Sequence, residues 1–509
     1  MVAMVGNALA QRFQRGLRRA PDGVCLTVGT ERITYAAAHR TALRWGAAVR
    51  ATAPDRPIGV LASGTTSYLG ILAGLYAGRT VVPLHAGFPP ARTRAMLAAA
   101  GAGAIITDDR TAAQVRDLAG DVPVLLAGKN LDAAGHAPLA DPAAPAGDAA
   151  YLLFTSGSTG RPKGVPITHG SLAHYFALLD DRYDFDRHDV FSQTFDLNFD
   201  CAMFDLFCAW GAGAEVLRVP PQAYRDLPDF LARNGVSVWF STPSAIGLVR
   251  RLGGLAPSSL PSLRWSFFAG EALRTDDAQA WQLAAPQSAV ENLYGPTELT
   301  VTVTAHRYGP ESGRLGVNGV VPIGALHHGH RMRLTAEDGT EAAEEGELWV
   351  SGPQLTPGYL DPADGAGRFA RHDGILWYRT GDRVRRLADG ELLYLGRLDA
   401  QVQLQGWRVE LTEIDHAVRG VPGVDDAVTV DATAGDAHEL VVFHTGDPVS
   451  PAGLSRALRA VLPDRLIPRH YEHRTELPLN SNRKTDRLAL RARAAELLAA
   501  AQLDRGSVA

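Results

Sequence analysis

The sequence predicts an α/β fold in which a large N-terminal domain is built on mainly parallel sheets and a smaller C-terminal domain is α+β. Three observations support this prediction. The chain has 509 residues, more than one ordinary hydrophobic core accommodates, and 46% of them are hydrophobic. Short apolar runs alternate with Ala- and Leu-rich stretches of helical period, and such alternation is typical of βαβ units.

The N-terminal part of the chain supplies the first of these elements. Residues 1–23 carry arginines but have neither the continuous apolar core nor the cleavage site of a secretory signal, so we expect an amphipathic helix there. Strands are then expected at RPIGVLA, VVPLH, GAIITDD and PVLLAG, and helices at SYLGILAGLYAG and ARTRAMLAAAG. Residues 127–149 are rich in Ala, Pro, Gly and Asp and are expected to form a surface connection.

The middle of the chain continues the alternation of strands and helices, and the C-terminal part has a different pattern. After a strand at AAYLLF and a loop, one face of a helix is expected from the apolar residues Leu172, Tyr175, Phe176 and Leu179. Past residue 396 the sequence LLYLGRLDAQVQLQGWRVEL indicates paired strands, and GLSRALRAVL and LALRARAAELLAAAQ indicate helices. We therefore place a boundary at Leu398–Asp399, which gives domains 1–398 and 399–509.

Composition narrows the class of partner. The formal net charge of −5 lacks the basic excess that binding to nucleic acid requires, so nucleic acid is not an expected partner. No run of 18 apolar residues occurs, so no membrane span is expected. Cys25, Cys201 and Cys208 cannot form a fully paired disulfide framework and lack zinc-ligand spacing, which favours a cytoplasmic location and no structural metal.

Lysine is rare in this chain, which has only Lys129, Lys163 and Lys484. Arginine supplies nearly every other cation. An ammonium is a compact point charge that reaches a phosphate or carboxylate where a planar guanidinium does not fit. A remaining lysine therefore marks a candidate position for such a contact, and two of the three, Lys163 and Lys484, lie in the motifs described below.

The loop TSGSTGRPKG has the residue types of a phosphate-binding loop. It is not a Walker A sequence and contains no GxSxG elbow. Glycines free backbone amides to surround an anion, and hydroxyl groups add donors. A flexible Gly/Ser turn is the alternative interpretation. The candidate residues are Thr155, Ser156, Gly157, Ser158, Thr159 and Gly160.

Five motifs occur in one order along the chain: LLFTSGSTGRPKGVPITH, ENLYGPTELT, YRTGDRVRR, GRLDAQVQLQGWRVEL and NSNRKTDR. This set resembles the adenylate-forming superfamily and, within it, the amino-acid adenylation domains of nonribosomal peptide synthetases. The resemblance covers most of the chain. It implies that an amino-acid carboxylate attacks the α-phosphate of ATP, and that a carrier phosphopantetheine thiol then takes the acyl group. It also implies a small mobile C-terminal domain that swings about Asp399.

The resemblance further implies a role for each motif residue. The loop from Thr155 would hold the departing phosphates, and Lys163 in the same loop would move with them. Thr297 would contact the α-phosphate, and Glu298 would bind Mg²⁺. Lys484 would reach the substrate carboxylate. The nucleoside would be held by Asp382 and Arg397 at the ribose and by Asn292, Tyr294, Gly295, Gly270, Glu271 and Ala272 around the adenine. The alternatives are a turn residue for Asp382, a first-turn helix acid for Glu298 and a solvated surface lysine for Lys484.

The stretch FDLNFDCAMFDLFCAW predicts the class of substrate. By resemblance, Asp200 pairs with the α-ammonium of an amino acid; a helix N-cap is the alternative role, and Asp196 is the rival carboxylate. The pocket is expected to hold a small neutral side chain, alanine first and glycine or serine next. Whether Phe204 and Phe267 fill the pocket or wall a longer one is left open. The pocket positions are Cys201, Phe204, Ser244, Phe267, Ala269, Leu293, Val301 and Thr302.

The sequence departs from the family pattern near its end. Gln403 and Gln405 stand where Lys and Arg are usual, and Arg483 replaces a glycine. No carrier segment follows Lys484, so the carrier is expected to be a separate protein. Two other functions compete with amino-acid activation. One is an acyl-CoA or aryl-acid ligase, and the other is a non-catalytic nucleotide-binding protein that docks a carrier.

Overall fold

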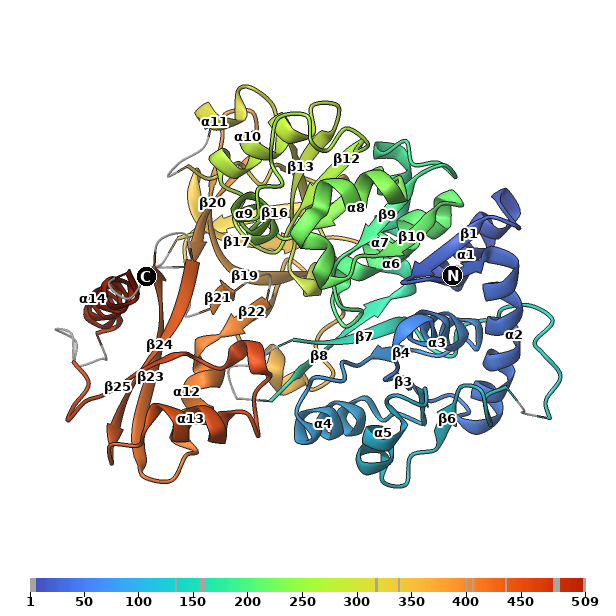
Figure 1. Cartoon of the computed structure of the whole chain (residues 1–509), viewed down its shortest axis with the longest axis horizontal. Helices are drawn as coiled ribbons and strands as arrows, with labels where there is room; N and C mark the ends of the chain where they lie inside the picture. The colour runs from blue at the N-terminus through green and yellow to red at the C-terminus, as the bar shows by residue number, and fades with distance from the viewer. Residues whose placement is uncertain are drawn as a thin grey trace. The chain divides into compact units, whose positions relative to one another are not determined.

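The computed structural model describes residues 6–132, 135–155, 161–315, 319–336, 339–398, 401–404, 407–434, 437–478 and 486–506 (Figure 1). The chain divides into two compact units. Unit 1 comprises Met1–Ala86, Met96–Phe154 and Gly164–Leu398, and unit 2 comprises Gly87–Ala95, Thr155–Lys163 and Asp399–Ala509. The predicted fold class is confirmed, because the two largest sheets are mainly parallel and the C-terminal part is α+β.

The largest sheet has nine strands with a parallel centre and antiparallel edges. Strands β1, β10, β9, β11, β12 and β13 are parallel neighbours, β2 pairs antiparallel at one edge, and β14 and β15 do so at the other. In spatial order the strands are β15 (Ala325–Leu326), β14 (Thr304–Arg307), β13 (Ala289–Tyr294), β12 (Trp265–Phe268), β11 (Val238–Ser241), β9 (Val190–Gln193), β10 (Glu215–Arg218), β1 (Val24–Val28) and β2 (Glu31–Thr34).

A six-stranded sheet and a five-stranded sheet complete unit 1. The five-stranded sheet is antiparallel. Its strand β20 pairs with β19, although the sequence pattern predicted that these residues pair with the strands that follow them. The six-stranded sheet contains β6 (Val124–Leu126), β5 (Ala104–Thr107), β3 (Ile58–Val60), β4 (Val81–Pro83), β7 (Ala149–Thr155) and β8 (Lys163–Thr168). The five-stranded sheet contains β16 (Arg331–Thr335), β17 (Glu345–Ser351), β19 (Ile375–Arg386), β18 (Phe369–His372) and β20 (Leu392–Arg397).

Helices of unit 1 pack against two of its sheets: α1, α6, α7, α8 and α10 share cores with the nine-stranded sheet, whereas α5 packs on the six-stranded sheet. The N-terminal amphipathic helix is confirmed as α1, which buries Leu9 and Phe13, and the predicted apolar face of α6 is buried as well. The helices up to residue 315 are α1 (Ala8–Arg19), α2 (Tyr35–Thr52), α3 (Gly64–Tyr76), α4 (Pro90–Ala100), α5 (Ala112–Ala119), α6 (His169–Arg182), α7 (Asp200–Ala212), α8 (Leu227–Asn234), α9 (Ser244–Arg251), α10 (Thr275–Ala284) and α11 (Ser312–Leu315).

The alternation of side chains along the strands separates two cores. Phe240 and Phe267 belong to a core that α1, α6 and α7 also build, while their neighbours Trp239 and Phe268 belong to a second core with α8 and α10. This follows from the two-residue period of a strand. Helix α7 is apolar on nearly all sides, and all its residues except Cys201 are buried, as expected for a helix inside a core.

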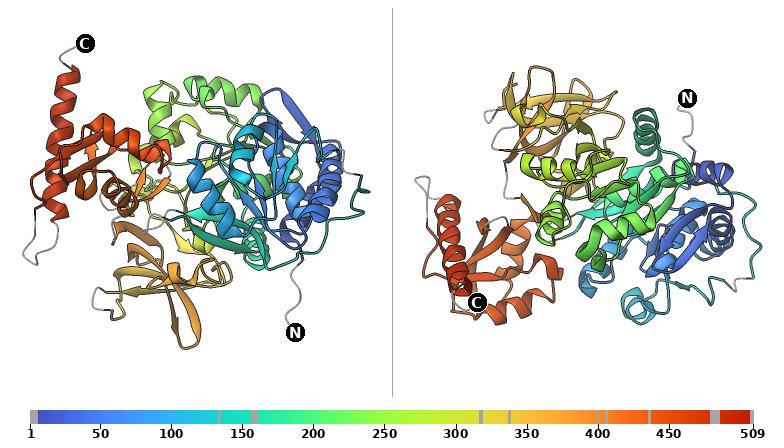
Figure 2. Two further views of the ribbon diagram at one scale, coloured as in Figure 1. Left: turned by 90° about the horizontal axis from the view of Figure 1, so that it is seen from below. Right: turned by 45° about the horizontal axis from the view of Figure 1, so that its top comes forward.

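Unit 2 contains a three-stranded sheet with helices on both faces (Figures 1 and 2). Leu440 and Val442 pack with α12 and α13 on one face, whereas Val441 and Phe443 pack with α14 on the other. A separate hairpin precedes this sheet. The elements are β21 (Gln401–Leu404), β22 (Trp407–Glu410), α12 (Leu411–Arg419), β23 (Val424–Ala434), β24 (Ala437–Gly446), α13 (Pro451–Leu458), β25 (His470–His473) and α14 (Arg487–Gly506). No helix in the described residues is long and apolar enough to cross a membrane.

Candidate active site

The predicted site residues of unit 1 follow the carboxyl ends of neighbouring parallel strands. Asp200 lies after β9, Ser244 after β11, Ala269 to Ala272 after β12, and Gly295 to Glu298 after β13. Strands β9, β11, β12 and β13 are adjacent in the sheet. In open α/β sheets, ligands bind at the carboxyl ends of the parallel strands. The fold therefore gathers segments that lie up to a hundred residues apart in the sequence.

Asp200 is a buried carboxylate beside the segment that follows β13. Its residue is 8% exposed, and burial raises the pKa of its carboxyl group from 3.8 to about 6. The hydrogen bond from the Thr297 side chain opposes this shift, and the charge of Glu298 adds to it. Among the described residues, no basic side chain forms an ion pair with Asp200. An added ammonium would therefore relieve a buried charge.

The structure bears on the two alternatives to ammonium binding by Asp200, which are a helix N-cap role and the rival carboxylate Asp196. The N-cap of α7 is Phe199, and Asp200 is the first residue within the helix, so the N-cap role is wrong. The rival Asp196 is a partly exposed residue whose Oδ2 lies 3.6 Å from Nε2 of His85. Asp196 thus has a potential cationic partner within the protein, and Asp200 has none in the described residues.

Glu298 is 0% exposed and has a positioning partner from a distant segment. The phenol of Tyr359 donates a hydrogen bond to Glu298 Oε1 at 2.6 Å, and the backbone N–H of Thr356 donates to Glu298 O at 2.9 Å. A buried carboxylate next to a hydroxyl residue, Thr297, fits Mg²⁺, which takes one or two carboxylates and completes its shell with phosphate and water. Such a site needs no cluster of protein ligands, and the described residues contain none.

The backbone just after Glu298 is strained. Thr300 has φ 58° and Val301 has φ 66°, although both side chains are β-branched. Each such residue costs on the order of 1–3 kcal/mol and persists only where the surroundings impose it. Gly295 packs against this segment so closely that a Cβ there would lie 2.6 Å from Thr302 Cα. The hydroxyls of Tyr175 and Thr302 are hydrogen bonded at 2.9 Å.

Three predicted nucleoside residues, one each from β13, β19 and β20, are joined by hydrogen bonds. Tyr294 donates to Asp382 Oδ2 at 2.5 Å, and Arg397 Nη1 donates to Asp382 Oδ1 at 3.1 Å and to Thr380 O at 2.9 Å. Burial, followed by the charge of Asp382, raises the pKa of Tyr294 well above 10, so this phenol is a proton donor at neutral pH. Asp382 is therefore an ordered, buried acceptor and not an exposed turn residue.

Asn292 has the free acceptor that recognition of an amino group requires. It is 1% exposed, and its Nδ2 donates to Val321 O at 3.3 Å and to Pro322 O at 2.8 Å. These two carbonyls fix the orientation of the amide. Its Oδ1 is buried and has no hydrogen-bond partner within the described residues. An orphaned acceptor of this kind fits the exocyclic amino group of adenine.

Most of the predicted pocket residues belong to one aromatic and aliphatic core. The ring of Phe204 lies 5.1 Å from that of Phe267 and 5.0 Å from that of Phe240, and all three are fully buried. Ser244 differs, because it is exposed and its hydroxyl pairs with that of Thr242 at 2.8 Å. The pocket residues in the core cluster are Cys201, Phe204, Phe267, Ala269, Leu293 and Val301.

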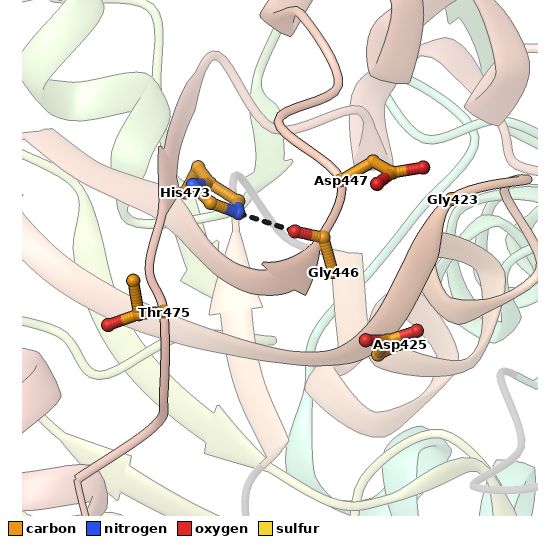
Figure 3. Close-up of a pocket in the computed structure, with 6 residues that line it drawn as sticks. All are labelled: Gly423, Asp425, Gly446, Asp447, His473 and Thr475. Carbon is orange, nitrogen blue, oxygen red and sulfur yellow. Dashed lines mark hydrogen bonds between the residues drawn. The ribbon is translucent and has the colours of Figure 1, made fainter.

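Several predicted residues lie outside the described part of the chain. Ser156, Gly157, Ser158, Thr159 and Gly160 lie outside the described residues, as do Asp399, Gln405, Arg483 and Lys484. Thr155 is the last residue of β7, Lys163 is the first of β8, and Gln403 lies on β21. A polar pocket in unit 2 contains none of the predicted residues: it is lined by Gly423, Asp425, Gly446, Asp447, His473 and Thr475 (Figure 3).

Sequence reasoning missed Tyr175, Gln354 and Tyr359, which brace the site from other segments. Tyr359 lies 61 residues from Glu298, and Tyr175 lies 127 residues from Thr302. Tyr175 was predicted only as an apolar helix residue. No local signal distinguishes Gln354, because the stretch after β17, GPQLTPG, has the Gly and Pro residues of an ordinary loop.

Fold and site together define an adenylate-forming enzyme, and comparison with known proteins agrees. The family model of AMP-binding enzymes matches residues 13–360. An L-proline–[L-prolyl-carrier protein] ligase of Streptomyces coelicolor is 37% identical over 82% of this chain and 83% of its own length. Enterobactin synthase component F of Escherichia coli is 34% identical over 83% of this chain, which spans only 34% of that protein.

Solved structures show the same fold. The crystal structure of IdnL7 has 53% sequence identity and a TM-score of 0.74, and it covers 97% of this chain and 99% of the other. The Vibrio cholerae adenylation domain AlmE, solved with glycyl-adenosine-5′-phosphate, has 29% identity and a TM-score of 0.85 over 97% and 99% of the two chains. The chain belongs to the AMP-binding enzyme family and, within it, to the adenylate-forming amino acid–carrier protein ligases.

Proposed function

We propose that this chain adenylates a small neutral amino acid with ATP and then transfers it to the phosphopantetheine thiol of a separate carrier protein. Alanine is the favoured substrate, followed by glycine and serine. The observation that carries this proposal is the buried carboxylate of Asp200, which lacks a cationic partner in the described residues and lies beside Thr297 and Glu298. A substrate ammonium would neutralise it at the point where the substrate carboxylate must meet the α-phosphate.

The proposed reaction has two steps, and residues of this chain support each of them. A carboxylate oxygen bonds to the α-phosphorus as the bond to pyrophosphate breaks; the thiolate then bonds to the acyl carbon as AMP leaves. Asp200 would orient the substrate, and Thr297, whose side chain is hydrogen bonded to Asp200, would contact the α-phosphate. Lys484 lowers the repulsion between carboxylate and phosphate. Glu298 would hold Mg²⁺, which neutralises phosphate charge when bound.

The nucleoside and the leaving phosphates have separate binding residues. Asn292 would accept from the adenine amino group through its free Oδ1, and Tyr294 would stack on the ring beside Gly270, Glu271 and Ala272. Asp382 would accept from the ribose hydroxyls, with Arg397 supporting it. The loop from Thr155 to Gly160 would bind the departing phosphates with Lys163. Residues 399–509 would act as the lid that carries Lys484.

The packing of the pocket supports a small substrate. The rings of Phe204 and Phe267 pack against each other and against neighbouring aromatic rings, which supports the interpretation that they fill pocket volume. None of the eight pocket residues is charged. A charged substrate side chain would therefore lose its hydration without gaining a partner. Proline is a second candidate, because a relative 37% identical is named as a proline ligase.

The test is ATP–pyrophosphate exchange with a panel of acids. The panel contains glycine, L- and D-alanine, L-serine, L-proline, β-alanine, glutamate and arginine, together with a fatty acid and an aryl acid. We expect exchange with the small neutral amino acids. Exchange only with the fatty or aryl acid would support the ligase alternative and contradict the proposed role of Asp200.

The cytoplasmic location is also our proposal, which the three free cysteines support. Fractionation of the producing cells would test it. Recovery of the enzyme outside the cytoplasm would contradict it.

A further inference from the structure

Gln354 is a buried amide from the segment after β17, and it contacts the strained backbone next to the proposed site. It is 0% exposed, and its Nε2 lies 3.0 Å from Leu299 O, 3.1 Å from Thr300 O and 2.8 Å from Thr302 O. The Thr300 hydroxyl donates to the main-chain O of Gln354 at 2.7 Å. Three carbonyls around one nitrogen require that this atom is the donor, so the amide has a single favourable orientation.

The contacts of Gln354 span the strained residues. Leu299 precedes the left-handed pair Thr300 and Val301, and Thr302 follows it. Relaxation of either φ angle to the negative range would break at least one of the three amide contacts, and Leu299 O or Thr302 O would lose the donor that Gln354 provides. Such a loss is costly inside a protein. The amide therefore opposes the relaxation that the β-branched side chains favour.

Two of the residues held in this way belong to the proposed amino-acid pocket. Val301 is 1% exposed within the same core cluster as Phe204 and Phe267, and Thr302 is 1% exposed and bonded to Tyr175. We propose that Gln354 is a positioning residue for substrate selection, which fixes the strained backbone so that Val301 and Thr302 keep the shape of the pocket wall. This inference rests on the proposed function, because it takes these two residues to face the substrate.

The test compares Gln354→Met with Gln282→Met. Methionine keeps the length of the side chain and removes its donors. Gln282 is a matched control in the same unit, because its Nε2 also donates to two backbone carbonyls, Ala285 O and Ser288 O, both at 3.0 Å, at the end of α10. Pyrophosphate exchange gives kcat and KM for ATP and for every amino acid that the wild-type enzyme activates, and thermal unfolding gives the stability of each variant.

We expect Gln354→Met to change the ratio of kcat/KM between the two best amino acids by about fivefold or more, while the ATP KM stays within about twofold. Gln282→Met should lose stability without changing that ratio. An unchanged ratio in Gln354→Met, whatever its stability, would overturn the inference. If Gln354→Met does not fold, Gln354→Asn is judged by the same ratio, because its shorter amide cannot reach all three carbonyls. Failure of the proposed function would show as wild-type enzyme that exchanges with no amino acid of the panel. Failure of the present inference would show only in the variant, as an unchanged ratio.

Discussion

Replacing Asp200 with asparagine should stabilise the protein while it impairs the enzyme. Burial raises the pKa of this carboxyl from 3.8 to about 6, a shift of about two units that corresponds to about 3 kcal/mol at neutral pH. The folded pKa is above the unfolded value, so the ionised carboxylate destabilises the folded state. This cost is absent well below pH 3.8, grows as pH rises to about 6, and is then constant. Asparagine removes the charge and keeps the shape.

The measurement is urea unfolding of wild type and Asp200→Asn at several pH values. We expect the variant to be more stable by up to about 3 kcal/mol at pH 7.5, by about half of that at pH 5, and by nearly nothing below pH 3.8. Asp196→Asn is the control. Asp196 is partly exposed beside His85, so its neutralisation should bring no such gain. A variant that is no more stable than wild type at pH 7.5, or a gain independent of pH, would refute the reasoning.

Three further substitutions test the proposed roles. Asp200→Ala should raise the KM for the amino acid far more than the KM for ATP in pyrophosphate exchange, and equal effects on both would contradict ammonium pairing. Lys484→Ala should remove most adenylation but leave ATP binding largely intact by calorimetry, so unchanged exchange rates would refute its role. Tyr359→Phe removes the 2.6 Å hydrogen bond to Glu298 and should raise the Mg²⁺ concentration for half-maximal exchange about tenfold; an unchanged Mg²⁺ requirement would show that Tyr359 does not position the metal ligand.

The sequence predicted those parts of the molecule that depend on local pattern. Apolar period predicted the buried faces of α1 and α6, and the alternation of runs predicted the parallel sheets. The strand β20 was grouped with the hairpin that follows it, because local pattern does not say which distant strand supplies the hydrogen-bonding edge. In the structure that edge belongs to β19.

In the candidate site, too, the sequence predicted the residues of local motifs but not the partners that lie far away in the chain. Motif order placed Asp382, Arg397 and Tyr294 in one site, and the structure joins them by hydrogen bonds. The N-cap alternative for Asp200 failed because the helix begins at Asp200 itself, and helix boundaries are uncertain by a residue or two from sequence. Gln354 and Tyr359 escaped notice because their partners lie more than fifty residues away, and no periodicity links them.

The site combines two energetically unfavourable features, a buried carboxylate and a strained backbone, and their combination has a physical reason. Asp200 keeps a charge at a buried position, and Thr300 and Val301 keep a left-handed backbone, and both features lie within unit 1. The carboxylate is held at its buried position by a mostly apolar helix, and the strained pair is held by the hydrogen bonds of Gln354 and, through Thr302, of Tyr175. A ligand that brings an ammonium to Asp200 relieves the first cost directly, so part of its binding free energy comes from strain already present in the free enzyme. Relaxing either feature would stabilise the empty protein and weaken its preference for an amino acid, which is why neither can be read as a defect of packing.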